Sequence, residues 1–198
     1  MRRGSNWLPL VLAVLLLRSS SSSAPSSAAP ALASGQVQKV PTGSADEGAW
    51  AAPRFALAIE VLAPNVGSAN VHEVALSVLA QWAHETAGGK SEFNFNLGGW
   101  RARKADPFFV AADSGEGPTP RKWTAYPSLP LAVADQLQRL HDVFPSAWRL
   151  LVANPLTSAW VEELGRRGYY TAPRDVYARS WGAHRVKLAA LLKARAAA

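Results

Sequence analysis

Residues 71–86 carry the pattern that most restricts how this chain of 198 residues can fold. Apolar side chains recur there at spacings of three and four residues, which places them along one stripe of an α-helix. They are Val71, Val74, Ala75, Val78, Leu79 and Trp82. Gly88 and Gly89 follow and end the helix, because glycine readily adopts the left-handed backbone that closes one. The sequence therefore predicts a helix that packs one face against a core.

Glu85 is the unusual residue of this helix. It lies three residues beyond Trp82 and seven beyond Val78, so the helical period places its carboxyl group on the apolar stripe. Burial raises the pKa of a carboxyl group, which suits it to donate a proton near neutral pH. A frayed helix end whose glutamate reaches water explains the same pattern equally well.

The first residues differ in composition from the rest. A basic start and the apolar run 8–17 are typical of a signal peptide and too short to span a bilayer. Small residues at Ala31 and Ala33 suit a signal peptidase, so we predict that residues 1–33 are a signal peptide, or an N-terminal anchor if uncleaved. The protein is then exported, periplasmic or extracellular, and meets a membrane only through an uncleaved leader. Residues 34–53, rich in Ala, Gly, Ser and Pro, are predicted to be a flexible linker.

Composition excludes several classes of function. The chain has no cysteine, which rules out disulfides and thiolate zinc sites, and its four histidines lack the spacing of metal ligands. We therefore expect no metal and no other cofactor. The formal net charge of +7 suits an anionic partner such as a cell wall, whereas the basic residues do not cluster as nucleic-acid binding requires. We expect a monomer.

Beyond the linker the pattern is mostly helical. Residues 55–62 form a short helix, and Asn70 with Glu73 predicts a capping box before the helix 71–86. Residues 108–112 and 122–126 read as two strands of a hairpin, joined by turn residues. Further helices are predicted over 128–141, 145–151, 157–168 (capped by Thr157) and 173–193, with Trp82 and Trp160 in the core.

Four short motifs follow in an order typical of one family. They are residues 84–91 (HETAGGKS), 96–102 (NLGGWRA), 123–128 (WTAYPS) and 164–173 (LGRRGYYTAP). In these motifs the domain 54–198 resembles the glucosaminidase domain of peptidoglycan hydrolases, the family of the flagellar rod-cap muramidase and several autolysins. The resemblance implies a mainly α (α+β) fold, with a lysozyme-like helical lobe and a small β-hairpin lobe.

The resemblance also implies an exported enzyme, similar to an endo-β-N-acetylglucosaminidase, that cleaves a β-1,4 bond beside N-acetylglucosamine in peptidoglycan glycan strands. Glu85 matches the family's catalytic acid, and Asp113, with Glu116 as the alternative, is the candidate second carboxylate. A sugar face is apolar and stacks on aromatic rings. The candidate substrate-binding residues are Asn96, Trp100, Trp123, Tyr126, Tyr169 and Tyr170. Trp123 and Tyr126 could equally pack the hairpin on the helices.

Two departures from the family pattern leave other functions open. Gly88 stands where the family usually has tryptophan, and Ala172 where it has aspartate. A lytic transglycosylase that uses Glu85 alone is one alternative. A wall-binding module that has kept the cleft without efficient chemistry is the other.

Overall fold

The computed structural model describes residues 35–113 and 117–197. In chain order its elements are α2 (Glu47–Leu62), α3 (Val71–Glu85), β1 (Phe108–Asp113), β2 (Gly117–Thr124), α4 (Leu129–Val143), α5 (Pro145–Ala153), α6 (Ala159–Arg166) and α7 (Arg174–Ala196). The predicted leader and Glu116 lie outside the described residues. Within the described part of the chain, no helix has both the length and the apolar character that a membrane crossing needs.

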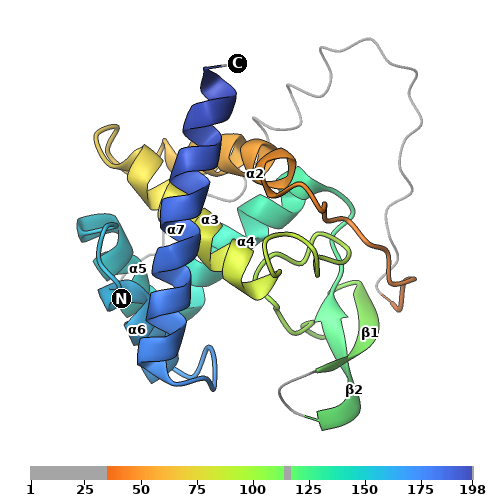
Figure 1. Cartoon of the computed structure of the whole chain (residues 1–198). Helices are drawn as coiled ribbons and strands as arrows, with labels where there is room; N and C mark the ends of the chain where they lie inside the picture. The colour runs from red at the N-terminus through yellow and green to blue at the C-terminus, as the bar shows by residue number, and fades with distance from the viewer. Residues whose placement is uncertain (1–34, 114–116, 198) are drawn as a thin grey trace.

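The helices form one lobe, and the antiparallel hairpin of β1 and β2 extends from it (Figure 1). α3 lies at the centre of the lobe, where α2 and α7 pack against it, and α5 packs against α6. This arrangement confirms the predicted mainly helical architecture with a small hairpin lobe.

The apolar stripe predicted over residues 71–86 is buried as α3. Val78 and Trp82 are almost completely inaccessible to solvent. Ser77 and Gln81, polar residues outside this stripe, are buried as well. α2 and α7 cover more than one side of α3, so its polar residues also face protein.

α3 ends at Glu85 because the residues that follow leave the helical backbone. Ala87, Gly88 and Gly89 have positive φ angles of 51°, 69° and 91°. A Cβ atom on Gly89 would lie 2.4 Å from the ring of Trp50, so only glycine fits at this position. The predicted glycine stop is confirmed.

The hairpin pairs Phe108 with Thr124 and continues to Ala112 opposite Pro120, with an irregularity before Asp113. The two predicted strands are confirmed, although β2 begins earlier than expected. An isolated antiparallel bridge also pairs Trp123 of β2 with Arg101, which lies in the loop before β1.

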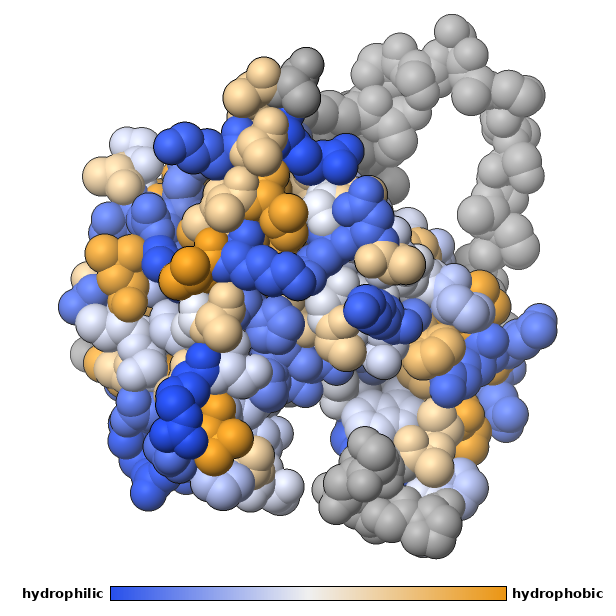
Figure 2. All heavy atoms as spheres, viewed as in Figure 1, coloured by the Kyte–Doolittle hydropathy of each residue, from blue (hydrophilic) through white to orange (hydrophobic). Residues whose placement is uncertain are grey.

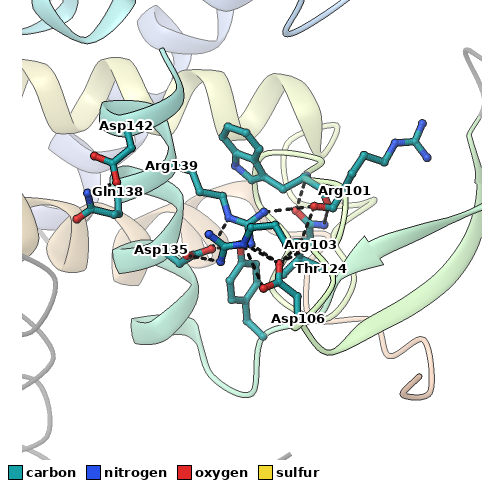
Figure 3. A network of polar contacts seen from close by, with 11 residues as sticks. Arg101, Arg103, Asp106, Thr124, Asp135, Gln138, Arg139 and Asp142 are labelled. Carbon is teal, nitrogen blue, oxygen red and sulfur yellow. Dashed lines mark hydrogen bonds and ion pairs between the residues drawn. The ribbon is translucent and has the colours of Figure 1, made fainter. Parts of the chain in front are cut away.

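A network of ion pairs joins the root of the hairpin to α4 (Figure 3). Arg139 donates 2.6 Å hydrogen bonds to both Asp135 and Asp106. Arg103 reaches the same two carboxylates at 3.2 Å. Burial works against the ionised form of Asp106, but hydrogen bonds from Arg103 and Arg139 hold its pKa below the usual range. These contacts fix the base of the hairpin against the helical lobe.

The prediction of a flexible linker over 34–53 was wrong, because both halves of this segment make contacts within the fold. α2 begins at Glu47, well before the predicted start at Phe55, and it includes Pro53. Trp50 is buried against the turn after α3. Local composition gives no sign of this burial, because the residues that Trp50 contacts lie far away in the sequence.

Two predicted helix caps are not formed. The Asn70 side chain makes no hydrogen bond at the start of α3, and Glu73 pairs instead with Arg185 of α7. Ser158, rather than Thr157, directly precedes α6. In the first case a long-range ion pair replaces the local interaction that the sequence predicts.

Candidate active site

Two cavities meet at the end of α3 and together form a cleft. The larger, of about 630 Å³, is lined by residues of α3, α4, α7, β2 and the loops between them. The smaller, of about 310 Å³, lies against both strands and the loop after α3. Glu85, Gly99 and Trp123 line both cavities. Figure 2 shows a deep notch between the helical lobe and the hairpin.

Glu85 is half-buried at the point where the two cavities meet. Its Oε1 atom accepts a 2.6 Å hydrogen bond from the Tyr177 hydroxyl and a longer one, 3.4 Å, from Gln81. Its Oε2 atom faces Gly99, where an added Cβ would lie 3.5 Å away. One carboxyl oxygen is therefore held by protein donors, while the other faces the cleft.

Burial raises the pKa of Glu85 to about 7, although the hydrogen bonds from Tyr177 and Gln81 act in the opposite direction. A carboxyl group with this pKa carries its proton in a large fraction of molecules at neutral pH. Burial, and then the charge of Glu85, raises the pKa of Tyr177 well above its usual value, so this hydroxyl stays a donor.

A cluster of polar groups supports the carboxyl group from behind. Gln81 donates a 2.8 Å hydrogen bond to the Tyr169 hydroxyl, which in turn donates a 2.6 Å hydrogen bond to the carbonyl oxygen of Gly98. The ring of Tyr177 stacks on Tyr170 with centroids 3.7 Å apart. Gln81 and Tyr177 were not predicted as site residues. Gln81 precedes Glu85 by one helical turn, a spacing that could have identified it, whereas nothing in the sequence links Tyr177 to this site.

The structure brings most of the predicted substrate-binding residues to the cleft. Trp100, Trp123, Tyr169 and Tyr170 all line the larger cavity. Asn96 lines the smaller one, where its buried side chain also bonds to the backbone N–H and carbonyl oxygen of Trp100 at 2.9 Å each. Asn96 thus fixes the loop that carries Trp100.

Tyr126 is not brought to this cleft. It is buried at the base of the hairpin, where its hydroxyl donates 2.7 Å to Asp135, and it lines a separate small cavity. The prediction that Tyr126 binds substrate therefore finds no support in the geometry. Its ring packs the hairpin against α4, which is the other role the sequence allowed.

One face of Trp123 is covered. The guanidinium carbon of Arg101 lies 4.1 Å from the centroid of the Trp123 ring. The indole N–H donates 3.2 Å to the carbonyl oxygen of Ala111. A sugar can therefore reach this ring only by its other face or its edge.

The structure describes the two candidates for the second carboxylate, Asp113 and Glu116, only in part. Asp113 ends β1, where its backbone pairs with Gly117, but its side chain is not described, and Glu116 lies outside the described residues. Among the side chains that the structure describes, Glu85 is the only carboxylate that lines either cavity.

His84, the residue before Glu85, also lines the larger cavity. Its Nδ1 atom lies 2.8 Å from the Ser180 hydroxyl, and burial, followed by the nearby His184, lowers its pKa. No cluster of three or more side chains suited to a metal ion occurs among the described residues.

The two departures from the family pattern lie in different places. Ala172 lines the larger cavity. Gly88 does not, and a Cβ at this position would meet the Glu47 carboxyl group at 3.0 Å. The space beside Gly88 is therefore filled by α2, and only Ala172 changes the cleft wall.

The fold defines a class, that of mainly helical, lysozyme-like domains with a hairpin lobe beside an acid-bearing helix end. Two solved structures resemble the fold of this chain, and both are of a peptidoglycan hydrolase from Sphingomonas sp. A1. A mutant of that protein matches with a TM-score of 0.57 and 22% identity, over 74% of this chain and 93% of that one. A second structure matches with a TM-score of 0.52 and 24% identity, over 70% and 89%. No family model and no curated protein matches this chain.

Proposed function

We propose that this protein is an exported peptidoglycan hydrolase that cleaves a β-1,4 glycosidic bond beside N-acetylglucosamine, with Glu85 as the general acid. One observation carries the proposal: a carboxyl group with a pKa of about 7 lies in the middle of a cleft with aromatic walls. The likeness of the fold to a protein described as a peptidoglycan hydrolase adds support.

The geometry around Glu85 suits proton donation to a glycosidic oxygen. Tyr177 and Gln81 hold Oε1, so a proton on Oε2 faces the cleft beside Gly99. Gly99 has no side chain, which leaves room for the leaving oxygen next to the acid. Protonation of that oxygen is the step that glycoside cleavage requires of an acid.

The position of Glu85 between two cavities favours cleavage within a strand. Sugars on one side of the scissile bond would lie in the larger cavity, against Trp100 and Tyr169. Sugars on the other side would lie in the smaller cavity, against Phe93 and Phe109. An endo-acting enzyme needs such space on both sides of its acid.

A lytic transglycosylase is the second candidate, and a specific observation favours it. Glu85 is the only carboxylate lining the cleft among the described side chains, and a transglycosylase works with one acid. In the hydrolytic reaction Asp113, or alternatively Glu116, would supply the second carboxylate. A free reducing end in the products identifies hydrolysis, and a 1,6-anhydro end identifies lytic cleavage.

The first experiment is lysis of purified cell walls by the Glu85→Gln variant. The amide keeps the shape of the side chain but cannot act as an acid, so we expect lysis to fall by on the order of 100-fold or more. Glu60→Gln on the exposed surface of α2 makes the same change away from both cavities and should keep full activity. Lysis by folded Glu85→Gln protein at the normal rate would reject the mechanism. A lack of lysis by the unmutated protein would favour the wall-binding module.

Export and oligomeric state belong to the same proposal. Residues 1–33 have the composition of a signal peptide, or of an anchor if they are retained. We propose that the domain acts on the wall as a monomer. Sequencing the N-terminus of the mature protein would distinguish a cleaved leader from a retained anchor.

A further inference from the structure

The segment 36–42, here called the strap, is part of the folded domain. Its Val37 donates 2.8 Å to the carbonyl oxygen of Phe108 in β1. The carbonyl oxygen of Val40 accepts a 2.8 Å hydrogen bond from the backbone N–H of Asn94. The backbone N–H of Val40 donates a 3.0 Å hydrogen bond to the side-chain oxygen of Asn94. The strap therefore lies along the hairpin on one side and the loop after α3 on the other.

The end of the strap is fixed to a buried ion pair. The Thr42 hydroxyl donates 2.9 Å to Glu92, whose carboxylate pairs with Arg54 at 2.5 Å. Glu92 and Arg54 are only 1% and 4% exposed. The indole N–H of Trp50 donates to the same carboxylate at 2.6 Å. These contacts hold the strap in one position relative to the cleft.

Lys39 of the strap lines the smaller cavity of the cleft. Its Nζ atom lies 3.8 Å from the centroid of the Phe93 ring, and its side chain is exposed. Among the described residues Lys39 forms no ion pair with an acid. Of the side chains that the structure describes, Glu85 is the one carboxylate lining this cavity, and it is half protonated near neutral pH.

The walls of the smaller cavity combine aromatic rings with polar side chains. Besides Lys39 and Glu85 they comprise Ser91, Phe93, Asn96, Gly99, Phe109, Ala111, Ala112 and Trp123. Aromatic rings suit the apolar face of a sugar. An ammonium group at the edge of such a cavity suits a carboxylate carried on that sugar.

We infer that the strap is a wall of the substrate cleft and that Lys39 binds a carboxylate attached to the glycan strand. This inference rests on the proposed function, and it names the feature of the substrate that the smaller cavity selects. Peptidoglycan carries carboxylates on its stem peptides, and on any lactyl ether that bears no peptide, whereas chitin-like glycans carry none. The protein then prefers an anionic strand to a neutral one of the same backbone.

The test measures binding, so that it does not depend on catalysis. Glu85→Gln protein is sedimented with native walls and with walls whose carboxylates have been converted to methylamides. An exposed ion pair of ordinary strength corresponds to about a five-fold preference for native walls. Adding Lys39→Gln should remove that preference, and Lys39→Arg should retain it. Lys193→Gln, an exposed lysine at the far end of α7, makes the same charge change away from both cavities and should leave the preference intact.

Two results would overturn the inference. One is a Lys39→Gln protein that keeps the full preference for native walls. The other is a loss of binding that is equal on native and amidated walls. Lysis by the unmutated protein is scored separately. Charge-selective binding that depends on Lys39, without any lysis, would refute the hydrolase and still support the carboxylate site.

Discussion

At the scale of single residues, the contact between Tyr177 and Glu85 opposes the effect of burial on the pKa of the acid. Oε1 accepts the 2.6 Å hydrogen bond from Tyr177, which favours the ionised form of the carboxyl group. Burial favours the neutral form and is the larger effect. The pKa of about 7 results from these two opposed influences.

Tyr177→Phe should raise the pKa of Glu85 further, because it removes a donor to the carboxylate. A hydrogen bond to a charged group corresponds to about one pKa unit. The alkaline limb of the pH profile of lysis, where the acid loses its proton, should therefore move upward by about that amount. Tyr170→Phe is the matched control, since its hydroxyl bonds to Val161 and not to Glu85. An unmoved limb in Tyr177→Phe would show that this hydroxyl does not set the pKa.

Glu85 should also make the stability of the fold depend on pH. In the folded protein its pKa is raised from 4.5 to about 7. The folded state therefore favours the protonated carboxyl group. The contribution of Glu85 to the free energy of unfolding is fully present below about pH 4.5 and is lost as the pH rises through 7. Glu85→Gln should then stabilise the protein at pH 8 by roughly 3 kcal/mol relative to its effect at pH 4. Urea denaturation at the two pH values measures the difference. An equal change at both values would contradict the raised pKa.

At the scale of elements, the ion pair between Arg54 and Glu92 joins α2, the strap and the loop after α3. A buried ion pair that loses one partner leaves an uncompensated charge. We therefore expect Arg54→Met to lower the free energy of unfolding by about 3–5 kcal/mol. The double variant Arg54→Met/Glu92→Leu removes both charges and should recover much of that loss. Urea denaturation of the three proteins checks both expectations.

The elements that the sequence predicts well are those with a strong local pattern. The apolar stripe of α3, its glycine stop and the hairpin are confirmed because periodicity and turn residues define them. The strap has no such pattern, since its hydrogen bonds reach residues 92–95 and 108. The same limit applies to the site. Glu85 follows from the helical period, whereas Tyr177 reaches it across a sequence separation that no local pattern spans.

At the scale of the whole molecule, the structure places the start of the folded unit earlier than the sequence suggests. A chain that begins at residue 54, the predicted domain start, would lack the strap and Trp50. Removal of a buried tryptophan alone costs about 3–5 kcal/mol, so we expect this chain to be largely unfolded. A chain that begins at residue 34 should unfold cooperatively. Circular dichroism during thermal unfolding compares the two, and equal melting temperatures would show that the strap adds no stability.

Under the proposed function, the position of Glu85 between two cavities has a consequence for the time course of wall breakdown. A cleft that extends past its acid in both directions accepts a polymer from the side and needs no chain end. Scission of that kind falls at random along the strands, so the mean strand length drops sharply with the first few cuts. Small soluble fragments accumulate only later, once neighbouring cuts fall close together. The mechanical strength of the wall would therefore fail well before much of its mass is released.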